Sequence, residues 1–314
     1  MTEKTTAAYI FPGQGSQRVG MGRDLYDNVS AAKAVFEQAD HILGFPLSSL
    51  CFEGPEEELH QTVNAQPALV TVSFACLQAA REISGENLHL PSFVAGHSLG
   101  EYTALATSGV LDFATMVYLA RERGKLMYEA GLLHPGGMAA IMGLDETSLD
   151  HICRQTGTWI ANINCPGQLV ISGSSKNMAL AVGSAKAKGA SRIIPLQVSG
   201  AFHTSLMQSA ANHLSVCINS LQFQEPEVPI IGNTTARPLT TTESIKTELL
   251  HQLCNCVQWQ RSIEYMLNEG VSTFIEIGPG KVLSNLMKRI NRDATTLNLG
   301  DLPSVINLGR KVIK

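Results

Sequence analysis

Gly96-His97-Ser98-Leu99-Gly100 follows the short apolar run 92–95 and precedes an amphipathic stretch that begins at Glu101. A strand that ends in a glycine turn and leads into a helix is the setting in which a G-x-S-x-G sequence forms a nucleophile elbow. The glycines allow a sharp turn, and the serine hydroxyl then stands at the helix N-terminus, where N–H groups and the helix dipole favour negative charge. Ser98 is therefore a candidate nucleophile, and a plain strand-to-helix turn is the competing interpretation.

Two other segments, one before and one after the Ser98 segment, show the same strand–turn–helix pattern, and together they predict the fold. Residues 8–11 form an apolar run that leads into the glycine turn 12–16, and residues 272–277 lead through Gly278-Pro279-Gly280 into a helix from about Val282. Apolar strands that pass through glycine turns into helices indicate an α/β fold with a parallel sheet covered on both faces. Ligands collect at the carboxyl ends of such strands.

The middle third follows another pattern. Its strands and helices are expected at residues 137–142, 148–155, 159–164, 168–173, 176–188 and 192–198. This β-α-β-β-α-β order is typical of a ferredoxin-like unit. We therefore expect a small subdomain at 129–199, inserted into a large one made of 1–128 and 200–314, with a cleft between them. The last ~20 residues are expected to form a surface tail.

Composition excludes several classes of protein. The chain has 314 residues, a formal net charge of -4 and a pI near 6.1, which gives no electrostatic reason to expect nucleic-acid binding. No apolar run approaches the roughly 20 residues of a membrane span, and the polar N-terminus is unlike a signal peptide. The 7 scattered cysteines favour reduced thiols in the cytoplasm, and the lone close pair Cys254 and Cys256 does not make a metal site.

His203 is a candidate base for Ser98. It follows the last strand expected in the small subdomain, where the chain re-enters the large one. A serine hydroxyl is a weak nucleophile and needs a base within hydrogen-bond reach, most often histidine. The position beside Gly200 and Phe202 favours this role, although the other histidines compete and a surface or capping role stays open.

Arg123 is a candidate binding residue. It lies at the edge of the apolar stripe of a helix expected from about Asp112 to Tyr128. A guanidinium on a largely apolar face needs an anionic partner. That partner is either an internal carboxylate or the carboxylate of a ligand, and the sequence leaves both open.

Two further segments carry polar groups near strand or helix ends. The turn Gly13-Gln14-Gly15 is not a dinucleotide fingerprint, because residue 18 is arginine where a glycine is required. It can still present backbone amides and the Gln14 side chain to an oxyanion. Gln258, near the start of a helix, is either a supporting residue of the site or a structural hydrogen bonder.

Seven motifs, taken in order, resemble those of the malonyl-CoA:acyl-carrier-protein transacylases, and the resemblance runs from about Ala8 to Lys288. They are Phe11-Pro12-Gly13-Gln14-Gly15-Ser16-Gln17, Gln66-Pro67-Ala68, Gly96 to Glu101, Arg123 to Met127, Asn164 to Ser172, Gly200 to His203, and Val257 to Trp259. The resemblance implies an α/β-hydrolase-like large subdomain with an inserted ferredoxin-like one, in agreement with the strand order above.

The resemblance also implies roles for single residues. Ser98 looks like the nucleophile and His203 like its base, held by a backbone carbonyl and not by a third acidic side chain. Arg123 looks like the clamp for the malonyl carboxylate. The backbone amides of Gln14 and Leu99 look like the oxyanion hole. The residues implied to line or support the pocket are Gln66, Met127, Phe202 and Gln258, and Phe202 is similar to the malonyl-selecting form of its motif.

The implied enzyme transfers malonyl from malonyl-CoA to the phosphopantetheine thiol of an acyl carrier protein and supplies fatty-acid synthesis. It is expected to be a cytoplasmic monomer that needs no metal or redox cofactor. A stand-alone acyltransferase of a polyketide synthase is the alternative for the pathway. Two rivals come from other classes. A serine hydrolase that edits carrier-bound acyl groups would lack the arginine at 123, and intact Ser98 and His203 argue against a catalytically silent docking protein.

Overall fold

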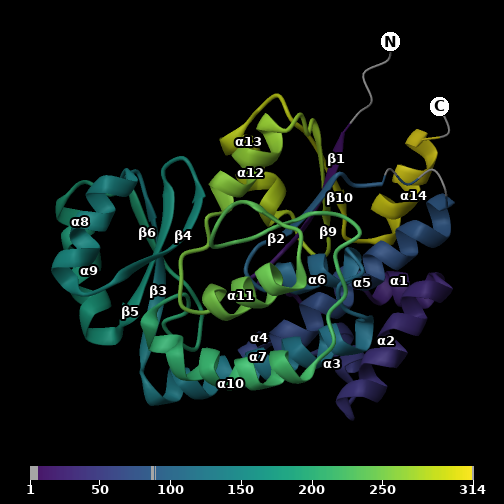
Figure 1. Ribbon diagram of the computed structural model, residues 1–314, viewed down its shortest axis with the longest axis horizontal. Helices are drawn as coiled ribbons and strands as arrows, with labels where there is room; N and C mark the ends of the chain where they lie inside the picture. Colours follow the sequence, from purple (N-terminus) through teal and green to yellow (C-terminus); the bar gives the residue numbers. More distant parts are fainter. Residues whose placement is uncertain (1–5, 86–87, 89, 313–314) are drawn as a thin grey trace.

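The larger of two sheets has six strands in the order β10-β9-β1-β2-β7-β8 (Figure 1). The computed structural model describes residues 6–85, 88 and 90–312. All neighbouring pairs in this sheet are parallel except β7 with β8, so the predicted α/β fold is confirmed. Its strands are β1 (Ala7–Phe11), β2 (Phe93–Gly96), β7 (Ile230–Ile231), β8 (Pro238–Leu239), β9 (Thr273–Ile277) and β10 (Thr295–Leu299).

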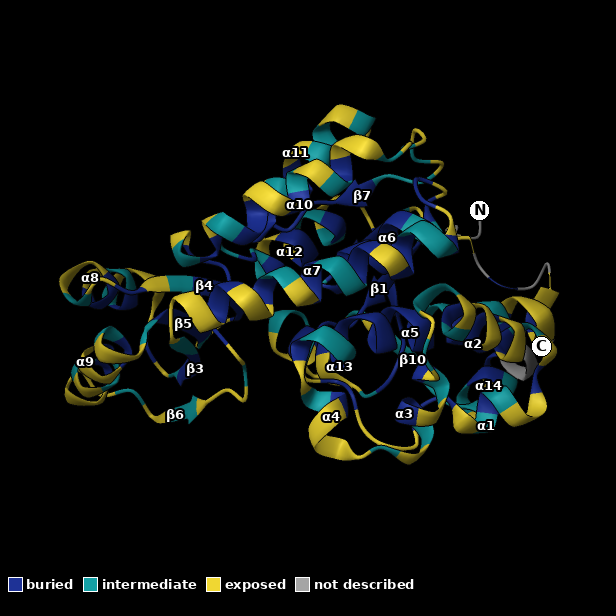
Figure 2. Cartoon of the chain, turned by 90° about the horizontal axis from the view of Figure 1, so that it is seen from below, coloured by how far each residue is buried: buried dark blue, intermediate teal, exposed yellow. Residues whose placement is uncertain are grey.

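Helices cover both faces of this sheet. Tyr9 and Phe11 of β1 pack among residues of α2, α5 and α7, whereas Ala8 and Ile10 face α12 and α13. Figure 2 shows that α5 is buried along most of its length. The helices of this part are α1 (Arg23–Asn28), α2 (Ser30–Leu43), α3 (Leu47–Glu53), α4 (Glu56–His60), α5 (Thr62–Ser84), α6 (Gly100–Thr107), α7 (Phe113–Leu133), α10 (Gln208–Ser220), α11 (Thr242–Gln252), α12 (Trp259–Asn268), α13 (Val282–Ile290) and α14 (Leu302–Val312). Within the described residues, no helix is both long and apolar enough to cross a membrane.

The C-terminal segment is part of the core, so the predicted surface tail is wrong. Strand β10 pairs with β9 along its full length, and α14 packs against α5. Val305 and Leu308 of α14 are buried, and their three-residue spacing places both on one face of the helix. Apolar residues that look isolated in a polar segment thus form the buried stripe of an amphipathic helix.

The smaller sheet belongs to a separate subdomain at one end of the molecule (Figure 1). Its elements are β3 (Gly136–Met142), α8 (Glu146–Thr156), β4 (Trp159–Cys165), β5 (Gln168–Ser174), α9 (Ser175–Ala187) and β6 (Arg192–Pro195). The antiparallel order β4-β5-β3-β6, with its own core, confirms the predicted ferredoxin-like arrangement. The last strand ends at Pro195 and not at residue 198. The division at 129–199 stays a proposal, because α7 runs unbroken through residue 128.

Candidate active site

A cavity of about 240 Å³ lies between the two subdomains. The small subdomain contributes Met138, Asn162 and Val170 to its lining, and the large one contributes the ends of β1 and β2. The predicted site residues that line it are Gln14, Ser98, Leu99, Arg123, Met127, Phe202 and His203. The topology therefore brings together residues from Gln14 to His203, which are far apart in the sequence.

The backbone around Ser98 has the geometry of a nucleophile elbow. Ser98 has a φ of 49°, in the left-handed region that side chains rarely adopt. A Cβ on Gly100 would lie 2.1 Å from the carbonyl oxygen of Phe11, and one on Gly96 would lie 1.9 Å from the carbonyl carbon of Gly100. Both positions therefore require glycine. The N–H of Ser98 donates to Asn233 Oδ1 at 2.7 Å, which ties the turn to the loop after β7.

His203 is placed and held as a base for this serine. Its Nε2 lies 2.9 Å from Ser98 Oγ, and its Nδ1 lies 2.7 Å from the backbone oxygen of Gln252. Because a carbonyl only accepts, Nδ1 carries the proton and Nε2 is free to accept from the serine. Burial, followed by the charge of Arg123, lowers the pKa of His203 to about 3. The imidazole is therefore neutral at pH 7.

Arg123 lies beside the serine, and no carboxylate of the described residues contacts it directly, although the charge of buried Glu101 acts on it. It is 1% exposed, and its Nη2 donates to Ser98 Oγ at 3.0 Å. It also donates to Gln66 Oε1 at 2.8 Å and Gln252 Oε1 at 2.9 Å, and its Cζ lies 5.5 Å from the centre of the Tyr102 ring. Among the described residues, no carboxylate forms an ion pair with Arg123. The internal salt bridge that the sequence left open is thus not formed, and the site offers a buried cation to an anionic ligand.

Leu99 and Gln14, whose backbone amides the resemblance implies as an oxyanion hole, both line the cavity. Leu99 precedes α6, and the first N–H groups of a helix have no partner within it. The N–H of Ser98 is already bound to Asn233, so the N–H of Leu99 is the one left for a ligand at this turn. Gln14 lines the cavity from the turn after β1, and its side-chain oxygen accepts a hydrogen bond from Thr62.

Gln252 is a site residue that the sequence analysis missed. Its backbone oxygen holds His203, and its side chain bridges Arg123 and the backbone oxygen of Ser98. As the last residue of α11 it has a carbonyl without a partner inside the helix. One signal was available in the sequence. Gln252 follows Ile245 and Leu249 at helical spacing, so a polar side chain occupies a buried position.

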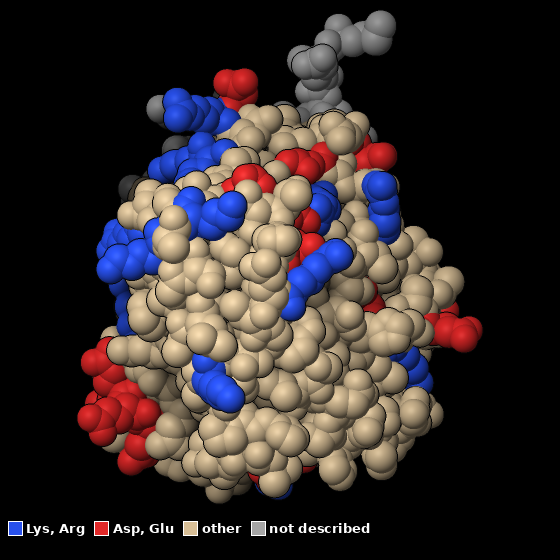
Figure 3. Space-filling view, turned by 90° about the vertical axis from the view of Figure 1, so that its left-hand side faces the viewer, with Lys and Arg blue, Asp and Glu red and all other residues tan. Residues whose placement is uncertain are grey.

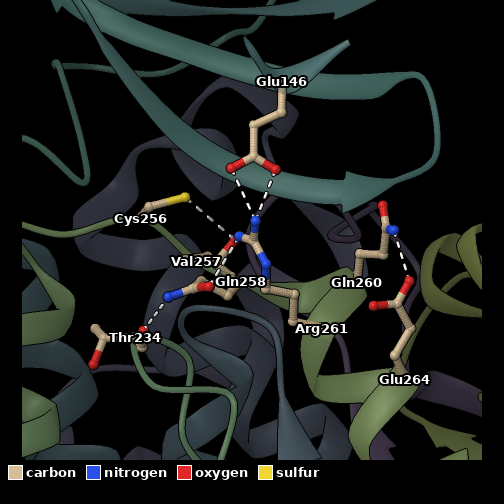
Figure 4. A network of polar contacts seen from close by, with 8 residues as sticks. All are labelled: Glu146, Thr234, Cys256, Val257, Gln258, Gln260, Arg261 and Glu264. Carbon is tan, nitrogen blue, oxygen red and sulfur yellow. Dashed lines mark hydrogen bonds and ion pairs between the residues drawn. The ribbon is translucent and has the colours of Figure 1, made fainter. Parts of the chain in front are cut away.

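Gln258, by contrast, does not line the cavity. Its side-chain amide donates to the backbone oxygen of Thr234 and accepts from Arg261, which also binds Glu146 of α8 (Figure 4). Gln258, implied to line or support the pocket, thus does not line it. Its side chain binds Thr234 and Arg261 of the large subdomain, and Arg261 pairs with Glu146 of the small one, so a supporting role stays a prediction. Gln66 was also expected to line or support the pocket. Its Oε1 accepts from Arg123 Nη1 and so helps to orient the guanidinium.

Comparisons with known proteins agree with this geometry. Residues 8–301 match the model of the acyl transferase domain family. The malonyl CoA-acyl carrier protein transacylase of Bacillus subtilis is 47% identical over 312 residues, which cover 98% of this chain and 97% of that protein. An acyl-carrier-protein S-malonyltransferase from Bartonella henselae superposes with a TM-score of 0.93 at 40% identity and covers 98% of this chain and 100% of its own.

A malonyl-transacylase solved in complex with a type II polyketide-synthase acyl carrier protein superposes with a TM-score of 0.92 at 39% identity, covering 98% of this chain and 99% of its own. The fold, the elbow and the sequence match define the chain as an acyltransferase. More narrowly, it belongs to the family of malonyl CoA-acyl carrier protein transacylases.

Proposed function

We propose that the chain transfers a malonyl group from malonyl-CoA to the phosphopantetheine thiol of an acyl carrier protein, through a malonyl ester of Ser98. The observation that carries this proposal is the buried Arg123 guanidinium, 3.0 Å from Ser98 Oγ, with which no carboxylate of the described residues forms an ion pair. A neutral acyl group leaves this buried cation without a counter-ion, whereas the free carboxylate of a malonyl group pairs with it.

The first half-reaction forms the ester. Nε2 of His203 takes the Ser98 proton as Oγ attacks the thioester carbonyl of malonyl-CoA. The N–H groups of Leu99 and Gln14 stabilise the tetrahedral oxyanion. When the intermediate collapses, the carbon–sulfur bond breaks and the imidazolium returns its proton to the leaving thiolate. Malonyl-Ser98 and free CoA result.

The second half-reaction repeats these steps with the other thiol. His203 takes the proton of the carrier's phosphopantetheine thiol, whose sulfur attacks the ester carbonyl. The bond between the carbonyl carbon and Ser98 Oγ then breaks, and the serine recovers its proton from His203. Because CoA leaves before the carrier reacts, ping-pong kinetics are expected.

The pathway of the carrier is proposed to be fatty-acid synthesis, with a stand-alone role in polyketide synthesis as the alternative. An acidic carrier favours a basic docking surface. Figure 3 views the end of the molecule that carries the small subdomain, where Lys and Arg side chains (blue) gather toward the upper left, with Asp and Glu side chains (red) beside and below them. The monomeric state and the cytoplasmic location stay predictions.

The low pKa of His203 predicts an unusual pH dependence. A histidine with the ordinary pKa of 6.5 is about 3% neutral at pH 5, so acylation through it would fall about thirtyfold between pH 8 and pH 5. With its pKa lowered to about 3, His203 stays neutral over this range. The rate constant for acylation by malonyl-CoA, measured by rapid quench before the first turnover, is expected to stay within about threefold. An acid limb centred near pH 6.5 would contradict this assignment.

Dependence on the carrier protein as acceptor distinguishes the proposed transferase from a hydrolase and from a docking protein. The protein is incubated with malonyl-CoA alone and with holo carrier protein, and malonyl-carrier, free malonate and the intact protein are followed by mass spectrometry. A transferase accumulates a malonyl adduct on the Ser98 peptide and passes it on only when the carrier is added. Rapid release of malonate without the carrier would indicate a hydrolase, and the absence of any adduct would indicate a docking protein.

A further inference from the structure

Glu101, in the first turn of α6, is a buried acid without a basic partner. It is 0% exposed, and within the described part of the chain no Lys, Arg or His forms an ion pair with it. Both carboxyl oxygens are instead occupied by amide groups of Asn233 and Gln252. These two residues are the ones that contact Ser98 and Arg123, so Glu101 lies directly behind the catalytic site.

Glu101 determines which way the Asn233 amide faces. Oε1 accepts from the backbone N–H of Asn233 at 3.0 Å and from its Nδ2 at 3.2 Å. The same Nδ2 donates to the backbone oxygen of Gly96 at 2.7 Å. With the nitrogen held between two acceptors, Oδ1 is left to accept the N–H of Ser98. Reversing this amide would place Nδ2 against that N–H, donor against donor.

Glu101 orients the Gln252 amide in the same way. Nε2 of Gln252 donates to Glu101 Oε2 and, at 3.0 Å, to the backbone oxygen of Ser98. Oε1 of Gln252 therefore faces Arg123, whose Nη2 it accepts at 2.9 Å. A reversed amide would present NH₂ to a guanidinium, which has no acceptor.

We propose that Glu101, as the ionised carboxylate, is the positioning residue for malonyl selectivity: its two oxygens then only accept and fix the Gln252 and Asn233 amides, and the Gln252 oxygen holds Arg123 in place. This inference rests on the proposed function, since it acts through Arg123. Only a carboxylate serves both amides, because every neighbour of its oxygens is a donor. Burial and the charge of Glu248 raise the pKa of Glu101, whereas the hydrogen bonds from Asn233 and Gln252 and the charge of Arg123 oppose the rise.

Two substitutions separate positioning from packing. Glu101→Gln keeps the volume but turns one oxygen into a donor, so one of the two amides must reverse or lose its partner. Glu101→Asp keeps an acceptor-only carboxylate but leaves a small void. We expect Glu101→Gln to lower the ratio of kcat/KM for malonyl-CoA over acetyl-CoA about tenfold or more, the effect of losing one hydrogen bond to a charged group. Glu101→Asp is expected to keep the ratio within about threefold of wild type.

The proposal would be overturned if Glu101→Asp lowered malonyl selectivity more than Glu101→Gln does. If Glu101 only fills space, Gln is the milder change and Asp the harsher one, and a folded Glu101→Gln enzyme keeps the wild-type ratio. Should Glu101→Gln not fold, Glu101→Asp still decides, because a loss of selectivity beyond tenfold in that folded variant contradicts the proposal. Glu276→Gln is the matched control. Glu276 is also 0% exposed, and its carboxylate accepts from the backbone N–H groups of Leu283 and Ser284 and from Asn298, so its loss should not change selectivity.

The wild-type enzyme distinguishes this proposal from the one on which it rests. If the wild type itself shows no preference for malonyl-CoA, the proposed function fails. The Glu101 variants then have no malonyl selectivity to lose. If the wild type prefers malonyl-CoA and Glu101→Gln retains that preference, only the positioning role fails. Circular dichroism and the thermal midpoint of each variant establish that folded proteins are compared.

Discussion

Ser98→Ala should lower malonyl transfer by roughly 10³-fold or more and leave no malonyl adduct on the protein. The reason is that, among the described residues, Ser98 Oγ is the hydroxyl that lies within hydrogen-bond distance of His203 Nε2, at 2.9 Å, and also accepts from Arg123. The amides of Leu99 and Gln14 stay in place, so any residual activity measures what they and substrate binding contribute without covalent chemistry.

Intact-mass spectrometry after incubation with malonyl-CoA checks this prediction, together with a carrier-transfer assay. Ser16→Ala is the matched control, because Ser16 lines the same cavity and makes no hydrogen bond with His203 or Arg123. That variant should acylate at close to the wild-type rate. A malonyl adduct that persists in Ser98→Ala at the wild-type rate would show that another residue is the nucleophile.

The parts of the fold that the sequence predicts well are those carried by local patterns. The elbow at Ser98 and the glycine turns after β1 and β9 are read from consecutive residues. The β-α-β-β-α-β order of the small subdomain follows from alternating periodicities and short turns. The C-terminal helix was missed because its apolar positions are spread through a polar segment; Val305 and Leu308 are the buried ones among residues 302–308, the part of α14 whose burial the structure describes.

The parts of the site that the sequence does not predict depend on long-range packing. Gln252 and Gln258 are six positions apart in the short connection between two helices: Gln252 is the last residue of α11, and Gln258 immediately precedes α12. Gln252 ends α11 with its carbonyl toward His203, whereas Gln258 faces the junction with the small subdomain. No local pattern decides between them. The neutral surroundings of Arg123 are likewise set by Gln66 of α5 and Gln252 of α11, which become its neighbours only through the fold.

Arg123→Ala should lose malonyl transfer and gain relative activity on acetyl-CoA. Leaving a buried charged partner unpaired costs roughly 2–5 kcal/mol, and this is the penalty that an acetyl group meets in the wild-type pocket. At about 1.4 kcal/mol per decade, the wild type should prefer malonyl-CoA by about thirtyfold to a few thousandfold. Removing the guanidinium removes that penalty, so the ratio of the two kcat/KM values should approach one.

The ratio is the quantity to measure, because Arg123 also donates to Ser98 Oγ and its loss lowers the absolute rate with either substrate. Arg121→Ala is the control on the same helix, since its guanidinium binds Val63 and Asn64 away from the cavity. That variant should keep the wild-type preference. Full malonyl preference in Arg123→Ala would mean that a different group binds the carboxylate. It would also leave unexplained why no carboxylate of the described residues forms an ion pair with this buried cation, whose hydrogen bonds go to amide and hydroxyl oxygens.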